Sequence, residues 1–292
     1  MATRFECLLE GSDPARLRAM AEALLEEVDR TERALSYYDP ESDLSRLNRQ
    51  AGRGPIPVSA LLLRTLLASE TVFHASRGAF DPVVGALMTA WGLSGSLDPA
   101  KRTPLGRNPS AAELEEARAS TGWQHVHIDT ANRTARIDRA GVSIDFGGIG
   151  KGVALDEARW AADELGIERG LLHGGTSSVL AIGGPFTVGV EDPGEPGSIL
   201  KTIELSDAAL GVSSPYGKVA ATGSGHVLDI RTGEPVTSYR LAAVVAEQAA
   251  LADAWATALT VNPTLLGQRP SPTGILECYV FQRSPSGAWT PA

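Results

Sequence analysis

The sequence is poor in cysteine and has no long apolar segment. Only Cys7 and Cys278 occur among its 292 residues, and two cysteines so far apart form neither a disulfide framework nor a metal cluster. We expect both to be reduced residues of strands. No run of about 18 apolar residues is present, and no apolar stretch of a signal peptide follows the first residues. The sequence therefore predicts no membrane insertion and, unless a leader precedes it, a cytoplasmic protein.

Clustered positive charge is also absent. The formal net charge is −9, and no run of Lys and Arg occurs, which argues against binding to nucleic acid or to a membrane surface. Hydrophobic residues make up 43% of the chain and charged residues 21%, as in ordinary globular proteins. An anionic ligand would therefore have to be held by local features, because the overall field repels it.

One glycine-rich segment, residues 143–156, offers such a local feature. Its sequence is Ser-Ile-Asp-Phe-Gly-Gly-Ile-Gly-Lys-Gly-Val-Ala-Leu-Asp, and we expect an apolar strand that passes through the glycines into a helix ending near Leu165. Glycines let backbone amides approach an anion, while Lys151 and the helix N-terminus add positive charge. We interpret the segment as a candidate pyrophosphate site. A plain tight turn is the alternative, because the spacing matches neither common Gly-rich nucleotide motif.

The rest of the pattern predicts helices first and strands later, which favours the α+β class. Asp81 and Pro82 are typical of an N-cap and a first helical residue, Ser42 is expected to open a short helix, and residues 92–109 are expected to be a loop. Longer helices are expected at 14–35, 59–77, 110–120 and 249–261, and strands at 3–10, 125–129, 133–138, 169–173, 178–182, 186–190, 199–204, 209–213, 226–230, 240–246 and 275–281.

Two polar residues interrupt the apolar helix expected at 249–261. Asp253 and Thr257 are four residues apart, so they project from one face and can share a ligand. A carboxylate and a hydroxyl are hard oxygen donors that suit Mg²⁺ together with phosphate oxygens. The alternative is structural, with Asp253 as an N-cap and Thr257 bonded back to its own helix.

His226 and Asp229 are the candidates for acid–base chemistry. His226 is expected at the start of a strand and Asp229 before a Thr-Gly turn, and a histidine near a carboxylate is a plausible general base. A structural histidine at a strand edge is the alternative. Two short segments could add to a pocket, one with Gly174 and Gly175 after an apolar strand and one with Ser213 and Ser214.

Taken together and in this order, these segments resemble the ApbE-type flavin transferases, the FAD:protein FMN transferase family. The similarity covers nearly the whole chain. It is carried by Met1–Thr3, the Ser-Tyr-Tyr to Leu-Asn segment 36–48, Phe-Asp-Pro-Val-Val-Gly-Ala-Leu at 80–87, the segment 145–156, His-Val-Leu-Asp-Ile-Arg-Thr-Gly at 226–233 and Ala-Asp-Ala-Trp-Ala-Thr-Ala at 252–258.

The resemblance implies a T-fold-like α+β fold with mixed or antiparallel sheets and packed helices. The whole chain, residues 1–292, would form one flavin transferase domain. This domain could consist of two lobes with the FAD site between them. The implied reaction is Mg²⁺-dependent transfer of FMN from FAD to a Thr or Ser hydroxyl of a target flavoprotein, with release of AMP.

The resemblance also implies roles for individual residues. Mg²⁺ would be held by Asp253, Thr257 and the carbonyl of Gly148, and His226 would be the general base, with Asp229 next to it. FAD would be contacted by Tyr38, Asp81, Gly147, Gly148, Lys151, Gly174, Gly175, Ser213 and Ser214.

The chain departs from the family pattern at Leu172, Thr176, Pro215 and Ile230. Pro215 removes a backbone donor and fixes φ at a turn expected to line the flavin site. Two further hypotheses therefore stay open. The same site could use water or a small alcohol as acceptor, acting as an FAD pyrophosphatase or small-molecule phosphotransferase, or the protein could be a non-catalytic flavin-binding module.

Overall fold

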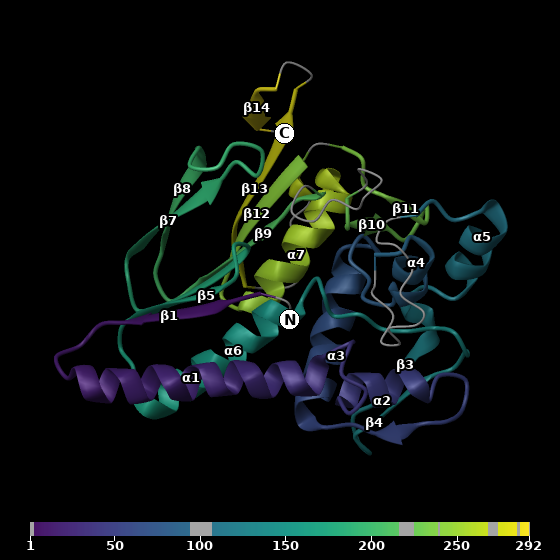
Figure 1. Cartoon of the computed structure of the whole chain (residues 1–292), viewed down its shortest axis with the longest axis horizontal. Coiled ribbons are helices and arrows are strands. Elements are labelled where there is room, and N and C mark those ends of the chain that lie inside the picture. The colour runs from purple at the N-terminus through teal and green to yellow at the C-terminus, as the bar shows by residue number, and fades with distance from the viewer. Residues whose placement is uncertain are drawn as a thin grey trace. The chain divides into compact units, whose positions relative to one another are not determined.

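The computed structural model describes residues 3–93, 107–215, 225–238, 240–267, 274–284 and 287–291 (Figure 1). The chain divides into two compact units. Unit 1 consists of Met1–Glu32, Ile149–Ser214 and Tyr239–Ala292, and unit 2 of Arg33–Gly148 and Pro215–Ser238. None of the helices in these described stretches combines the length and apolarity needed to cross a membrane.

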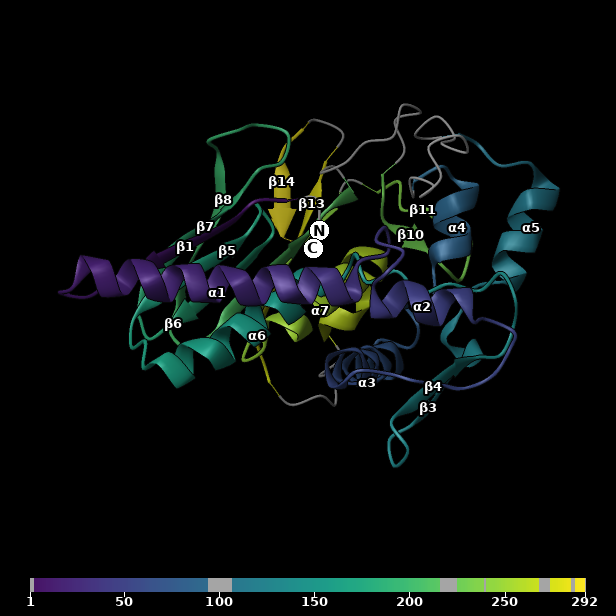
Figure 2. The ribbon, with the colours of Figure 1, turned by 60° about the horizontal axis from the view of Figure 1, so that its bottom comes forward.

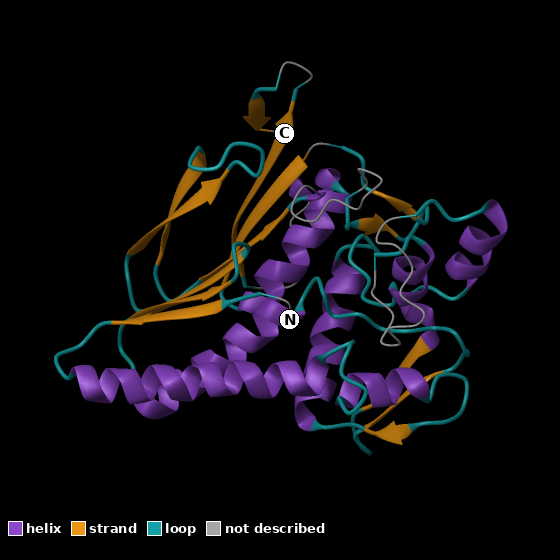
Figure 3. Cartoon of the chain, in the orientation of Figure 1, coloured by secondary structure: helices purple, strands orange, loops and turns teal. Residues whose placement is uncertain are grey.

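Unit 1 is built on an antiparallel sheet of seven strands, coloured orange in Figure 3. In spatial order the strands are β1 (Phe5–Leu9), β5 (Gly170–Gly174), β6 (Ser178–Ile182), β9 (Ala209–Ser213), β12 (Arg240–Ala246), β13 (Ile275–Arg283) and β14 (Trp289–Pro291). β6 is buried along its whole length, as expected for a strand with both sheet faces covered.

The two faces of this sheet have different covers. A hairpin of β7 (Phe186–Glu191) and β8 (Ile199–Leu205) packs on Val179 and Ala181 of β6 and on alternate residues of β9 and β12. The residues between them point to the opposite face, where α6 (Gly150–Leu165) and α7 (Ala249–Val261) lie (Figure 2). The long helix α1 (Pro14–Leu35) follows β1, and the short 3₁₀ helix η4 (Pro263–Gly267) follows α7.

Two glycines let α7 approach its neighbours closely. A Cβ on Gly152 of α6 would lie 2.2 Å from the carbonyl oxygen of Ala249, and a Cβ on Gly211 of β9 would lie 2.4 Å from the backbone of Ala252. Any side chain at these positions would push α7 away from the start of α6 or from the sheet. The glycines thus fix where the second turn of α7, with Asp253, lies in unit 1.

Unit 2 combines short helices with two small sheets. A three-stranded sheet has the order β2 (Ile56–Pro57), β4 (Thr134–Ile137) and β3 (Val126–Asp129), and a two-stranded one joins β10 (Leu228–Asp229) to β11 (Glu234–Pro235). The helices are α2 (Asp43–Arg49), α3 (Ala60–Ala75), α4 (Gly85–Ala90), α5 (Ala111–Ala119) and the 3₁₀ helix η2 (Trp123–His125).

Most predicted elements are confirmed, and the α+β class with them. The bounds of α1, β6, β9, β12 and α7 are those predicted, and Ser42 opens its helix as expected. Ser59 and Ser110, the first residues of two expected helices, are the N-caps of α3 and α5. The strand expected at 226–230 is reduced to Leu228–Asp229. Of the loop expected at 92–109, residues 94–106 lie outside the described residues.

Two local predictions are wrong. Residues 143–146 are not a strand of any sheet, and Asp81 is not an N-cap, because α4 begins only at Gly85 with Val84 in the cap position. The backbone of Ile144 is bonded instead by the side-chain amide of Asn48, at 2.9 Å in both directions. The neighbouring amides of Gly85 and Asp145 pair with the carbonyls of Ser143 and Pro82. These contacts join the segments 36–48, 80–87 and 143–148 within unit 2.

Candidate functional site

Asp253 is a buried, hydrogen-bonded carboxylate of unit 1. Its residue is 5% exposed. Its Oδ1 accepts a hydrogen bond from the Ser178 hydroxyl at 2.6 Å, and its Oδ2 accepts one from the Gly152 amide at 2.9 Å. The structural alternative of an N-cap is wrong, because Gln248 occupies the cap position of α7. The carboxylate is therefore oriented by neutral donors from β6 and α6.

Lys151 is the cation beside this carboxylate. Its Nζ lies 3.5 Å from Asp253 Oδ2. Of the four clustered glycines, Gly150 and Gly152 belong to the first turn of α6 in unit 1. Gly147 and Gly148 lie in the turn before it, where the segment Arg33–Gly148 of unit 2 ends. The helix start and Lys151 are two positive features that suit an anionic ligand, and the Lys151 charge is paired with Asp253 in this structure.

Thr257 lies one turn of α7 after Asp253. Every other residue of α7 is buried, whereas Thr257 is partly exposed. Its hydroxyl donates to the Asp253 carbonyl at 3.2 Å, so the back-bonding expected for a structural threonine is present. A hydroxyl oxygen that donates its proton still has lone pairs to offer, and this contact is compatible with a ligand role.

These donors fit a hard divalent cation. Each carboxylate oxygen has about two acceptor positions, and the single neutral donor on each Asp253 oxygen leaves room for a cation. No group of three or more His, Cys, Asp or Glu side chains that could hold a metal is found in the described part of the chain. An ion here would therefore need oxygen atoms from water and from a phosphorylated ligand, which is how Mg²⁺ is commonly bound.

Asp156 was not predicted, yet it fixes the start of α7. Its carboxylate oxygens accept from the amides of Ala249 and Ala250 at 2.7 and 2.9 Å. Burial raises the pKa of Asp156 to about 6, against the opposing effect of these two amides. Each helix thus supplies a carboxylate to the N-terminal amides of the other, since Asp253 of α7 accepts from Gly152 of α6.

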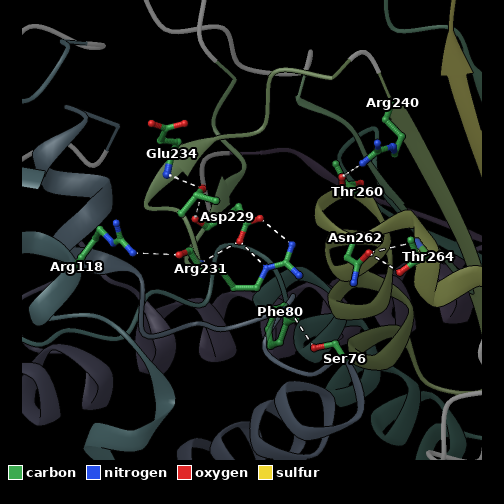
Figure 4. Close-up of polar contacts among 11 residues, drawn as sticks. Ser76, Phe80, Arg118, Asp229, Arg231, Glu234, Arg240, Thr260, Asn262 and Thr264 are labelled. Carbon is green, nitrogen blue, oxygen red and sulfur yellow. Dashed lines mark hydrogen bonds and ion pairs between the residues drawn. The ribbon is translucent and has the colours of Figure 1, made fainter. Parts of the chain in front are cut away.

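The other predicted residues of unit 1 lie at strand ends. Gly174 ends β5 and Gly175 follows it in the turn to β6, where its amide donates to the carbonyl of Arg4. Ser213 ends β9, and its carbonyl accepts from the Thr260 hydroxyl at 3.1 Å. Figure 4 shows the Thr260 carbonyl accepting from Arg240. Ser214 follows Ser213 and is partly buried.

Asp81 is a buried carboxylate of unit 2 that links two backbone segments by hydrogen bonds. Its Oδ1 accepts from the Val83 amide and its Oδ2 from the Trp123 amide, both at 2.8 Å. Burial raises the pKa of its carboxyl to about 6, although the two amides and the nearby His125 act in the opposite direction. Backbone donors therefore already engage both oxygens, and its predicted contact with FAD stays a prediction.

Asp229 is held by Arg231. Figure 4 shows the guanidinium forming two bonds to the carboxylate, Nε to Oδ1 at 2.8 Å and Nη2 to Oδ2 at 2.7 Å. The Arg231 amide adds a third bond at 3.0 Å. Burial opposes ionisation of Asp229, but these bonds outweigh it and lower its pKa. His226 is partly buried and precedes β10, and its pairing with Asp229 stays a prediction.

The remaining candidates of unit 2 are Tyr38, Gly147 and Gly148. Tyr38 is 50% exposed and meets the ring of Tyr37 edge to face. The Gly147 amide donates to Asp145 at 2.8 Å, and both glycines lie in a turn that begins after Phe146. The sequence did not single out Ser178, Arg231 or Asp156. The available signals were a serine that opens an otherwise apolar strand and an aspartate directly after the buried stretch Gly152–Leu155 of α6.

The fold and these contacts define an α+β protein with a candidate site for a divalent cation and a phosphorylated ligand. The comparisons with known proteins agree. The model of the ApbE family matches residues 1–269, and the chain belongs to this family. The proposed resemblance is thereby confirmed.

Curated relatives are named FAD:protein FMN transferase, and similar solved structures are named ApbE. The chain is 27% identical to a protein of Salmonella typhimurium named FAD:protein FMN transferase, over 92% of this chain and 78% of that one. A protein of that name from Chlamydia pneumoniae is 30% identical, over 76% and 69%. The crystal structure of the ApbE protein from Thermotoga maritima matches with a TM-score of 0.83 and 28% identity, over 99% of this chain and 97% of that one. This match confirms the predicted fold.

Proposed function

We propose that this protein transfers FMN from FAD to a Thr or Ser hydroxyl of a target flavoprotein and releases AMP, in a reaction that depends on Mg²⁺. The observation that carries the proposal is the Asp253 carboxylate, oriented by Ser178 and Gly152 and lying beside Lys151. Membership of a family whose curated relatives are named FAD:protein FMN transferase supports it.

In the proposed reaction, the acceptor hydroxyl oxygen attacks the phosphorus of the FMN half of FAD. The bond between that phosphorus and the oxygen bridging to AMP breaks, and AMP leaves with the bonding electrons. His226 takes the proton of the hydroxyl, with Asp229 next to it. Mg²⁺, held by Asp253, Thr257 and the Gly148 carbonyl, would neutralise charge on the diphosphate, the main requirement of phosphoryl transfer.

Binding of FAD is assigned to residues that the family motifs place along the chain. Lys151 would pair with the diphosphate, as its position at the start of α6 favours. The other proposed contacts are Tyr38, Asp81, Gly147, Gly148, Gly174, Gly175, Ser213 and Ser214.

The test is to incubate the protein with FAD, Mg²⁺ and a cell extract, and to follow AMP release and covalent flavin fluorescence on a denaturing gel. We expect both signals, and His226→Ala should lower both by ~10²–10⁴-fold, the usual contribution of a general base. AMP without a fluorescent protein band would indicate water or a small alcohol as acceptor. Neither signal, with FAD bound, would indicate a flavin-binding module and overturn the proposal.

A further inference from the structure

Lys151 has a second relationship that its proposed contact with FAD does not use. Its ammonium forms the one ion pair that Asp253 makes with a described residue, at 3.5 Å from Oδ2. The Lys151 side chain is 21% exposed, whereas that of Asp253 is 3% exposed. The pair thus joins a buried anion to a cation on a flexible chain that still reaches solvent.

A buried carboxylate is costly without a compensating positive charge. The other two groups on Asp253 are neutral, the Ser178 hydroxyl and the Gly152 amide. Lys151 therefore supplies the only full positive charge that neutralises Asp253 among its described contacts. In the proposed function, a diphosphate would need the Lys151 ammonium, and a divalent cation would need the Asp253 carboxylate.

We infer that Lys151 is a resident counter-ion of Asp253, displaced when a divalent cation binds and thereby released to the diphosphate of FAD. The inference rests on the proposed function, and it adds an order to it. Free of nucleotide, Lys151 competes with the metal ion. With nucleotide bound, Lys151 is engaged elsewhere and the competition ends.

Geometry and charge both support competition. Oδ2 already accepts from the Gly152 amide, and the Lys151 ammonium lies 3.5 Å from the same oxygen, beside its remaining acceptor position. An ion coordinated at ~2.0–2.1 Å by either oxygen of Asp253 would face the ammonium across a few ångströms of poorly solvated space, where like charges repel strongly. The four-carbon side chain of lysine can swing away without moving α6.

Competition of this kind couples the two ligands. The metal ion should raise the affinity for FAD because it frees Lys151, and FAD should raise the affinity for the metal ion by the same factor, as linkage requires. Substitution of Lys151 by a neutral residue should weaken the coupling in both directions, down to the part that comes from direct contact between the metal ion and the diphosphate. It should also make the metal ion bind more tightly when no nucleotide is present.

The first experiment measures Mg²⁺ binding to the nucleotide-free protein by calorimetry. Lys151→Met should bind Mg²⁺ about 10-fold more tightly than the unchanged protein, a difference of about 1.4 kcal/mol. Lys201→Met is the matched control, because it removes the same charge from unit 1 at a lysine that lies over the Tyr279 ring. It should leave Mg²⁺ affinity within ~2-fold. Ser178→Ala removes a neutral donor and should weaken Mg²⁺ binding instead.

The second experiment measures FAD binding by flavin fluorescence with and without Mg²⁺, in a His226→Ala background where turnover is slow. Mg²⁺ should raise FAD affinity by a larger factor when Lys151 is present than in Lys151→Met, and an equal factor in both proteins would contradict the inference. If Lys151→Met does not fold, Lys151→Gln takes its place, and a larger rise in melting temperature with Mg²⁺ gives the same information.

Two failures can be told apart. If Lys151→Met binds Mg²⁺ no more tightly than the unchanged protein, the counter-ion inference is wrong, while loss of Mg²⁺ binding in Asp253→Asn would still support the proposed function. If Asp253→Asn binds Mg²⁺ normally, the metal ion lies elsewhere, and both the metal assignment and the inference fall.

Discussion

Two carboxylates from the predicted site, one in each unit, are held in opposite ways. In unit 1, Asp253 receives two neutral hydrogen bonds, and the cation paired with it among the described residues, Lys151, is 3.5 Å away on a flexible side chain. In unit 2, Asp229 receives both arms of the Arg231 guanidinium at 2.7 and 2.8 Å, and the Arg231 amide as well.

The difference decides what each carboxylate can do. A guanidinium that bonds both oxygens of a carboxylate neutralises its charge and fills acceptor positions on each oxygen. The Asp229 carboxylate is therefore held within its own turn by Arg231. Asp253 is fixed in orientation, yet its charge is balanced only by a lysine that can leave. The residue type is the same in both motifs, and the neighbouring donors determine which one is suited to a metal ion.

The largest expected effect is on Asp253. If it holds Mg²⁺, Asp253→Ala should lower metal-dependent cleavage of FAD by ~10³-fold or more, because the ion's charge stabilisation is worth several kcal/mol. AMP release measured across a Mg²⁺ titration gives the result. Asp253→Asn, of the same volume, should show the same loss.

Asp192 of unit 1 provides the matched control. It is also a buried carboxylate, 4% exposed, and it accepts from the Gly194 amide in its own loop. Asp192→Ala should lower stability and keep the dependence on Mg²⁺. A stable Asp253→Ala protein with full turnover would show that Asp253 does not hold the metal ion, and Asp253 would then differ from Asp229 in no functional respect.

The sequence predicted what depends on local pattern and missed what depends on distant partners. Short apolar runs sufficed for β6, β9 and β12, and a longer apolar run sufficed for α7. The strand expected at 143–146 failed because Asn48, 96 residues away, bonds the Ile144 backbone. Likewise, Asp81 is tied to Trp123, 42 residues on, and Asp253 to Ser178, 75 residues back. Such pairings follow from the folded chain and from no local spacing.

Asp81 gives a second test, since it is a carboxylate of unit 2 held without an arginine. Its pKa is raised to about 6 mainly by burial, against ~3.9 in an unfolded chain. The folded state therefore binds the proton more tightly, and this residue's contribution to stability is present below pH ~4 and lost as pH rises through about 6.

Asp81→Asn should remove that pH dependence. One of the two amides, of Val83 or Trp123, would also lose its acceptor, at a cost of ~1–3 kcal/mol. Urea unfolding between pH 4.5 and 7.5 should show the variant approaching the unchanged protein as pH rises. If the difference in free energy of unfolding between the two proteins stays constant or widens with pH, Asp81 is not a buried carboxyl with a raised pKa. The contrast in unit 2 between Asp81, held by backbone amides, and Asp229, held by an arginine, would then be lost.

The smallest expected effect is that of replacing Arg231, the residue whose guanidinium holds the Asp229 carboxylate of unit 2. The Arg231 side chain is 44% exposed, so solvent screens the pair, and Arg231→Met should lower the free energy of unfolding by only ~0.5–1 kcal/mol at pH 7. Since the pKa of Asp229 is lowered in the folded protein, this contribution is present above pH ~4 and lost as pH falls through the folded value. A double-mutant cycle with Asp229→Asn should assign most of the loss to the pair, and Arg231→Lys, which keeps the charge without the fork, should recover part of it. A cycle with no coupling would show that the two-armed contact does not hold Asp229, and the carboxylates of the two units would then be equally open to a ligand.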